Sequence, residues 1–278
     1  MEGNLKKHAI QRLQVRGRSV KLADWDPGAT PGCKTKEEAA ERLARNLERI
    51  DAQQYRLFAE ARRSLLIVLQ GMDTAGKDGL IRKVMTVFNP QGCRVWPFKV
   101  PTTEEATHDF LWRIHRAAPA RGEVSIFNRS HYEDVLVVRV HDLVPKPVWS
   151  RRYKQINVFE RHLHVHGTQV IKLFLHISRK EQRDRLLARL DDPLKRWKFS
   201  DADLAERKHW NEYQHAYEEA LGRCSTRQAP WYVIPANNKW YRDLAVSEIL
   251  AETLEAMDPK LPRVKLDAKG LRARLMAP

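Results

Sequence analysis

The amino-acid sequence predicts an α/β fold with a central parallel sheet and helices on both faces. Short apolar segments of strand length alternate along the chain with longer segments that have helical spacing of apolar residues. Strands that are separated by helices pair in parallel, and both faces of such a sheet are covered. The apolar segment 65–69 also leads through a glycine-rich turn into a helix-like segment, which is typical of a phosphate-binding loop. These observations favour a three-layer sandwich in which a phosphate-binding loop follows the first strand.

The elements follow in order along the chain. The first expected helix spans 36–62, with Thr35 as N-cap and Glu38 three residues later as its capping-box partner. The turn 89–92 has the sequence Asn-Pro-Gln-Gly and separates the helix after the glycine-rich loop from the second strand. The strands are expected over 65–69, 93–100, 124–127, 170–177 and 231–235. The later helices are expected from about 78 and over 102–117, 131–141, 148–166, 179–190, 203–221 and 239–257.

Composition limits the class of protein and its partners. The chain has 278 residues, and 50 Lys plus Arg against 35 Asp plus Glu give a net charge of +15. Such a charge attracts polyanions, but it does not distinguish nucleic acid from a chain of inorganic phosphate. The sequence has no apolar span of about 20 residues and no signal-peptide pattern, so we expect a soluble, cytoplasmic protein without membrane contact. Three widely spaced cysteines argue against a disulfide framework and a zinc knuckle.

The domain organisation is expected to be simple. Residues 1–34 have little periodicity and are interpreted as an irregular N-terminal arm. A single domain is expected over 35–258, followed by a basic C-terminal tail over 259–278.

The glycine-rich turn predicts phosphoryl-transfer chemistry. Backbone N–H groups of such a loop converge on phosphoryl oxygens, and its lysine reaches the terminal phosphates. Asp78 stands where a P-loop usually has the Ser or Thr that helps to hold magnesium, so another oxygen ligand is needed. Asp73 lies inside the loop and is the first candidate for it. The predicted phosphate-binding residues of the loop are Gly71, Ala75, Gly76, Lys77, Asp78 and Gly79.

Other polar residues follow the ends of the remaining strands. In parallel sheets the ligand lies beyond the carboxyl ends of the strands, so residues from distant positions are expected to meet there. Lys99 follows the second strand, and Arg185 and Arg189 lie on the helix after the fourth. The third strand is followed by Asn128, Arg129, Glu133 and Asp134. Residues 133 and 134 are expected in a helix, so either carboxylate could point away from the site. Asp73 is therefore preferred over both as the metal ligand.

With these residues assembled, the chain resembles the polyphosphate kinase 2 family, P-loop kinases that use inorganic polyphosphate as phosphoryl donor to nucleotides. The similarity extends over roughly residues 15–255, and several of its motifs are rare outside the family. They are Gly-Met-Asp-Thr-Ala-Gly-Lys-Asp-Gly (71–79), His-Asp-Phe-Leu-Trp-Arg-Ile-His (108–115), Phe-Asn-Arg-Ser-His-Tyr-Glu-Asp-Val (127–135), Arg-Leu-Asp-Asp-Pro-Leu-Lys-Arg-Trp-Lys-Phe (189–199) and Ala-Pro-Trp-Tyr-Val-Ile-Pro-Ala (229–236).

The resemblance implies a P-loop kinase-like three-layer sandwich with a helical lid, and it implies a role for each motif. Asp73 and Lys77 take the Walker A role, residues 127–135 take the Walker B role, and a mobile lid covers about 189–210. Many relatives have an acidic residue where this chain has Asn128, and the block here resembles the class III subgroup, which acts on nucleoside mono- and diphosphates. A homo-oligomer is implied as well.

The resulting hypothesis is polyphosphate-dependent phosphorylation of AMP and ADP, with ATP as a product and substrate of the reverse reaction. Mg²⁺, with Mn²⁺ as an alternative, would be held by Asp73 and Asn128. The predicted catalytic residues are Asp73, Lys77, Arg129, Arg185 and Arg189, and the predicted nucleotide-binding residues are Asn128, Arg129, Glu133 and Asp134. Lys195, Arg196 and Lys198 would bind the phosphate chain from the lid, although Asp–Lys pairs there also fit a structural turn.

Two other functions share some of these sequence features. An ATP-dependent nucleoside monophosphate kinase would share the sheet, the loop and an arginine lid, but it needs neither Asp78 nor the excess positive charge. A nucleic-acid-binding protein would use the basic arm and tail, but the intact Lys77 and the polar strand ends make nucleic acid an unlikely partner.

Overall fold

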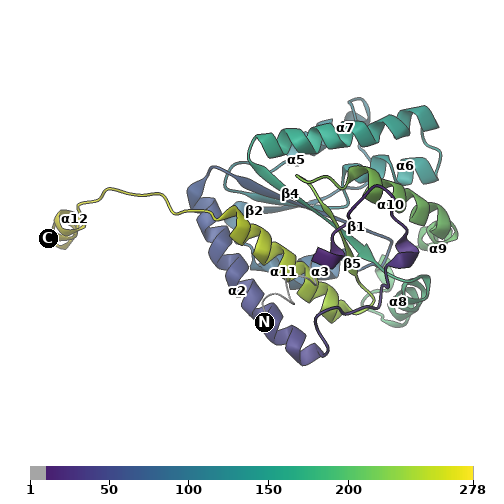
Figure 1. The fold of residues 1–278 in the computed structure, drawn as a ribbon, viewed down its shortest axis with the longest axis horizontal. Coiled ribbons are helices and arrows are strands. Elements are labelled where there is room, and N and C mark those ends of the chain that lie inside the picture. Colours follow the sequence, from purple (N-terminus) through teal and green to yellow (C-terminus); the bar gives the residue numbers. More distant parts are fainter. Residues whose placement is uncertain (1–10, 278) are drawn as a thin grey trace.

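The computed structural model describes residues 11–277 and contains a central five-stranded sheet (Figure 1). The strand order is β2-β3-β1-β4-β5, and every pair of neighbours is parallel. The predicted α/β class and parallel sheet are therefore confirmed. The strands are β1 (Ser64–Gly71), β2 (Cys93–Pro97), β3 (Val124–Asn128), β4 (Thr168–His176) and β5 (Trp231–Pro235).

Helices cover both faces of this sheet. In Figure 1 the long helices α2 and α11 lie together on one side with α3, while α5, α6, α7 and α10 lie on the other. The bounds are α2 (Lys36–Glu60), α3 (Lys77–Lys83), α4 (Thr103–Ala106), α5 (Trp112–Ala117), α6 (Val137–Val140), α7 (Lys146–Val165), α8 (Arg179–Asp191), α9 (Asp201–Lys208), α10 (Trp210–Cys224), α11 (Lys239–Met257) and α12 (Ala268–Met276). Short 3-10 helices cover Leu22–Asp24, Met85–Val87, Pro90–Gly92, His131–Asp134 and Arg196–Lys198.

The predicted start of the first helix is confirmed, but its capping box is not. Thr35 Oγ1 accepts the backbone N–H of Glu38, as an N-cap does. The Glu38 carboxylate does not return to Thr35; it accepts the N–H of Lys34 and a hydrogen bond from Arg42. The Glu38 carboxylate is therefore occupied by Arg42, one turn further along the helix, and by the backbone of Lys34.

Three predicted helices are interrupted. The 102–117 segment breaks into α4 and α5 because the Asp109 carboxylate accepts the N–H of Leu111 and starts a new turn there. The 131–141 segment begins as a 3-10 turn, capped by Ser130, before α6. The 203–221 segment divides at His209 into α9 and α10. The second strand is also shorter than expected, since it ends at Pro97, which has no N–H to donate.

The core lies on both faces of the sheet and extends to the N-terminal segment. All eight residues of β1 are buried, as expected for a central parallel strand. Within the predicted arm, Leu13 and Val15 are buried, Val15 N–H donates to Trp231 O at 2.9 Å, and Gln14 bridges to Tyr232. The first ten predicted arm residues lie outside the described part. Among residues 11–277, no helix is both long and apolar enough to cross a membrane.

Candidate active site at the carboxyl end of the sheet

The loop after β1 has a backbone that two glycines make possible. Gly71 has φ of 156°, and an added Cβ would lie 2.8 Å from the carbonyl oxygen of Leu175. Gly76 has φ of 102°, and a Cβ there would lie 2.1 Å from Nη1 of Arg242. Because any side chain at Gly76 would displace a buried guanidinium, glycine is required both for the turn and for the close packing behind it.

Lys77, the first residue of α3, folds over this loop. Its ammonium donates to Gly71 O at 2.7 Å and to Met72 O at 3.3 Å. Burial lowers the pKa of Lys77, and the nearby positive charge of Arg129 lowers it further. Asp73, Glu133 and Asp78 act in the opposite direction. The lysine is therefore held at the loop among one arginine and three carboxylates.

Arg129 joins two carboxylates beside Lys77. Its Nη2 donates to Asp73 Oδ1 at 3.0 Å, and its Nη1 lies 3.6 Å from Glu133 Oε2. The arginine has φ of 63°, a left-handed conformation that is uncommon for a side chain of this size. Residues from the ends of β1 and β3 are thus brought together as the strand-end argument predicted.

The two acidic residues after β3 point to different places. Glu133 belongs to the Lys77 group, and burial raises the pKa of its carboxyl against the effect of Arg129 and Lys77. Asp134 accepts from Arg152 Nη1 at 3.0 Å, and burial raises its pKa to about 6. From the sequence, Asp73 is expected to serve the site before either of these carboxylates. In the structure Glu133 also faces the loop, whereas Asp134 is paired with Arg152 of α7.

Asn128 and Asp78 lie opposite each other at the strand ends. Asn128 Nδ2 donates to Asp78 Oδ1 at 3.0 Å, which leaves the amide oxygen of Asn128 as the group available to a cation. Lys198, from the predicted lid, lies 3.8 Å from Asp78 Oδ2. The aspartate that replaces a P-loop hydroxyl therefore pairs with the β3 end and with the lid.

Arg185 braces the loop from behind. Its Nη1 donates to Thr74 O and Ala75 O, and its Nη2 donates to Ala236 O and Asn237 O, all at 2.6–3.0 Å. Its Nε donates to Glu181, and the side chain is only 10 % exposed. The guanidinium therefore holds the loop backbone in place. The catalytic contact with phosphate expected from the sequence stays a prediction.

The lid residues fall into two groups. Arg189 lies 3.4 Å from Asp203 Oδ2 and donates to Lys198 O, so it ties α8 to the segment beyond it. Lys195 pairs with Asp192, and Arg196 Nε donates to Leu190 O at 2.6 Å, as in the structural-turn interpretation. Of the three predicted lid cations, Lys198 is the one placed beside the phosphate loop.

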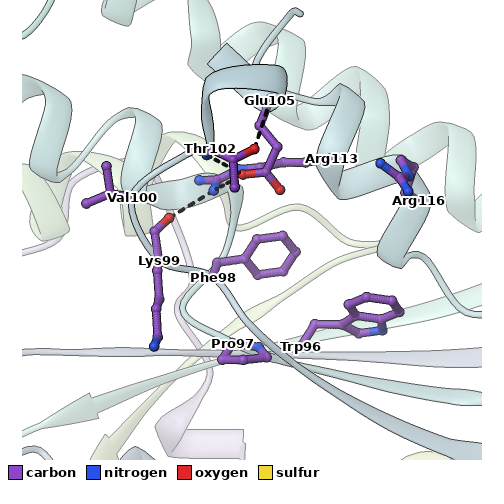
Figure 2. Close-up of a pocket in the computed structure, with 9 residues that line it drawn as sticks. All are labelled: Trp96, Pro97, Phe98, Lys99, Val100, Thr102, Glu105, Arg113 and Arg116. Atoms are coloured by element: carbon purple, nitrogen blue, oxygen red, sulfur yellow. Dashed lines mark hydrogen bonds and ion pairs between the residues drawn. The ribbon is translucent and has the colours of Figure 1, made fainter.

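Lys99 lies at the edge of the site, where β2 ends. A cavity of about 530 Å³ opens between this strand end and α4 and α5, and Figure 2 shows the residues around it. The backbone carbonyl of Lys99 accepts from Arg113 Nη1 at 2.9 Å, while its side chain runs past Phe98 towards Pro97 (Figure 2).

Comparison with known proteins identifies the family. The family model for polyphosphate kinase 2 matches residues 33–262. The chain belongs to the polyphosphate kinase 2 family. It is 52% identical over 253 residues to an AMP/ADP-polyphosphate phosphotransferase of Meiothermus ruber, covering 91% of this chain and 94% of the relative. It is 45% identical to an ADP-polyphosphate phosphotransferase of Rhodopseudomonas palustris, covering 88% and 89%.

A solved structure supports the same assignment. The crystal structure of polyphosphate kinase 2 from Arthrobacter aurescens TC1 superimposes with a TM-score of 0.92 at 44% identity, and the match covers 95% of each chain. The P-loop kinase-like sandwich expected from the sequence is thereby confirmed as the polyphosphate kinase 2 fold.

Several residues beside the loop of this candidate site are not among those expected from the sequence. Gln182 Nε2 donates to Asp73 O at 3.2 Å, and Arg242 Nη1 donates to Gly76 O at 3.1 Å, so two further side chains support the loop backbone. Tyr217 of α10 is buried next to Glu133, Arg129 and Asp73, and burial raises its pKa. Tyr213 and Tyr217 are four residues apart, and this helical spacing is the signal that could have indicated a shared face.

A buried charged network lies beneath the 127–135 block. Lys172 of β4 is fully buried; its ammonium donates to Glu160 Oε2 at 2.6 Å, to Tyr132 OH at 2.9 Å and to Cys224 O at 2.6 Å. Glu160 also accepts from Tyr132 OH at 2.8 Å and lies 3.3 Å from His131. A lysine within the apolar run 170–175 is visible in the sequence, and the network it forms fixes the backbone that carries Arg129 and Glu133.

The donor set suits a hard divalent cation. Within residues 11–277, no group of three or more His, Cys, Asp or Glu side chains is arranged to hold a metal by itself. Mg²⁺ is usually bound by one or two carboxylates together with substrate phosphates and water. Asp73 and Glu133 provide two carboxylates and Asn128 an amide oxygen, so the residues present fit a metal that arrives with phosphate.

Proposed function

We propose that this protein transfers the terminal phosphoryl group of inorganic polyphosphate to AMP and ADP, and catalyses the reverse reaction, in a magnesium-dependent manner. The observation that carries the proposal is the grouping of Lys77, Arg129, Asp73 and Glu133 at the carboxyl ends of β1 and β3. The similarity over nearly the whole chain to a relative named for AMP, ADP and polyphosphate supports the substrates.

The reaction requires alignment and charge compensation. An oxygen of the acceptor's terminal phosphate forms a bond to the terminal phosphorus of polyphosphate. The bridging P–O bond breaks, and its electron pair leaves with a chain shortened by one unit. Because the attacking oxygen is already anionic, no general base is needed, and the site accordingly supplies cations beside the loop.

Each side chain then has a defined task. Lys77 and Arg129 neutralise charge on the phosphoryl group in flight, and Gln182, Arg185 and Arg242 hold the loop carbonyls in place. Mg²⁺ or Mn²⁺ held by Asp73, Glu133 and Asn128 would compensate the negative charge of the phosphates.

The segment 189–210 is proposed as the lid of this site. Lys198 beside Asp78 and Arg189 beside Asp203 connect it to the loop and to α8. Leu194 and Trp197 are 84% and 77% exposed, so the segment packs little against the body in this structure. A lid with few apolar contacts can open and close at low cost in free energy.

A homo-oligomer is also proposed, with the outer face of α7 as the contact. Val148, Val158 and Val165 are exposed along this helix. Light scattering on the purified protein at micromolar concentration would give the mass of a multimer, and a monomer mass would contradict the proposal.

The deciding experiment supplies AMP or ADP with magnesium and either long-chain polyphosphate or ATP as the sole donor. We expect ADP and then ATP from AMP with polyphosphate alone. Lys77→Ala should lower turnover by about 10²–10³-fold while the circular dichroism spectrum stays unchanged. Phosphorylation of AMP by ATP with no response to polyphosphate would contradict the proposal.

A further inference from the structure

A second cavity lies along the N-terminal segment, and no residue of the phosphate loop lines it. Its volume is about 370 Å³, within the usual range for small-molecule sites. The segment runs beside β5, which is an edge strand, and β4 separates β5 from β1. Three strand spacings, about 14 Å, therefore separate this segment from the strand that leads into the phosphate loop. The cavity is lined by Gln11, Arg12, Gln14, Arg16 and Trp25.

The backbone around this cavity is fixed to the body of the protein. Gln14 forms a β-bridge with Tyr232, and the N–H of Val15 donates to the backbone of β5 at 2.9 Å. At Trp25, the backbone carbonyl accepts from Nε2 of buried His176 at 3.1 Å. The cavity is therefore largely formed before a ligand arrives, as is usual for small-molecule sites.

Two arginines without carboxylate partners line the cavity. Burial alternates along the segment: Leu13 and Val15 are buried in the core, whereas Arg12, Gln14 and Arg16 line the cavity. Within residues 11–277, neither Arg12 nor Arg16 forms an ion pair. A planar guanidinium binds phosphate through two parallel hydrogen bonds, so a pair of uncompensated guanidinium groups favours a phosphorylated ligand.

Trp25 gives the same cavity an aromatic wall. Its ring is partly buried against the core and also lines the cavity. The exposed part of the ring can stack on a planar ligand at little cost in side-chain entropy, because the rest of the ring is already held. Gln11 and Gln14 each add an amide that both donates and accepts hydrogen bonds, which suits the edge of a heterocyclic base.

We propose that this cavity is a second nucleotide site, which binds a nucleoside triphosphate outside the catalytic site. Arg12 and Arg16 would bind the phosphates, and Trp25 would stack on the base. Inorganic polyphosphate would use the two arginines but would gain nothing from the aromatic ring. A nucleoside triphosphate uses both, so the cavity favours the nucleotide over the phosphate chain.

The test counts the ATP molecules bound per chain. Calorimetric titrations with ATP and magnesium, without polyphosphate, compare the unmodified protein with the double variant Arg12→Ala/Arg16→Ala. Arg18→Ala is the matched control, because Arg18 is exposed on the same segment and lies outside the cavity. All three arginines are exposed, so these variants should fold. Trp25→Leu is titrated with ATP and with tripolyphosphate, which has the phosphates but no base.

We expect the double variant to bind one ATP fewer per chain than the unmodified protein, because loss of two charged hydrogen-bond donors weakens the second site about 100-fold. Arg18→Ala should match the unmodified protein. Trp25→Leu should bind ATP about tenfold more weakly at this site, with tripolyphosphate binding unchanged.

An unchanged ATP count in the double variant would overturn the site. Equal affinity of ATP and tripolyphosphate for the second site of the unmodified protein would overturn its assignment to a nucleotide, and this comparison needs no variant at Trp25. Because the count is a difference between two proteins, a catalytic site that bound no ATP would contradict the proposed function without affecting this result.

Discussion

Arg185 gives the sharpest test of how the phosphate loop is held. Its guanidinium donates to four backbone carbonyls, two in the loop after β1 and two after β5. A hydrogen bond of this kind contributes about 1 kcal/mol, so Arg185→Ala should lower the free energy of unfolding by about 4 kcal/mol. Arg185→Lys keeps the positive charge but not the planar guanidinium, so it should lower the free energy of unfolding by about half as much.

The effect on catalysis should appear in turnover. If the loop moves by about 1 Å, misalignment of the phosphoryl group costs about 10²-fold in rate. Stability is measured by urea unfolding followed by circular dichroism, and kcat and KM for polyphosphate are measured on the same preparations. Arg183→Ala is the control, because Arg183 is 56% exposed and its ion pair within residues 11–277 is with the adjacent Asp184; the variant should change the free energy of unfolding by less than about 0.5 kcal/mol.

One result would refute this account. If Arg185→Lys kept the unmodified stability and turnover while KM for polyphosphate rose, Arg185 would be a phosphate ligand, as its position after β4 first suggested. The bracing role requires loss of stability and loss of kcat together.

Three further predictions concern the metal, the buried network and pH. Glu133→Gln should raise the Mg²⁺ concentration needed for half-maximal rate about tenfold, whereas Asp134→Asn should leave it unchanged; a magnesium titration of the rate distinguishes them. Lys172→Met should cost about 3–5 kcal/mol in urea unfolding, and adding Glu160→Met should restore much of it; a double variant no better than the single one would contradict a paired network. Burial lowers the pKa of His176 to about 4, so the unfolded chain binds a proton at this residue at higher pH than the folded protein does. The stability that neutral His176 contributes is complete above about pH 6.5 and is lost as pH falls towards 4. The urea midpoint of His176→Gln should therefore fall less over that interval than the midpoint of the unmodified protein.

The fold was predictable because its signals are local and repeated. Apolar runs and helical spacing placed every strand of the sheet, and Thr35 marked the start of α2. The helix interruptions were missed because they depend on single polar contacts, such as Asp109 to the N–H of Leu111, which helical periodicity does not register.

The site was predictable as a set of strand ends but not in its internal assignments. Sequence position placed Lys77, Arg129 and Asp73 together. Sequence position alone does not show that Glu133 faces the loop and that Asp134 faces α7. These directions depend on a 3-10 turn held by Ser130 and on Arg152 from a later helix. Likewise, the sequence places Arg185 near the strand ends but does not show that its guanidinium donates to backbone carbonyls of the loop.

The N-terminal segment also governs how this chain can be shortened. The edge of β5 is occupied by Gln14 and Val15, and Trp25 O accepts from buried His176. A fragment limited to residues 33–262, the span matched by the family model, would present the unpaired backbone of β5 to solvent and to other chains. Shortened versions of this protein should therefore retain the segment from residue 11 onwards, and fusion partners belong at the other end, where α12 lies away from the sheet (Figure 1).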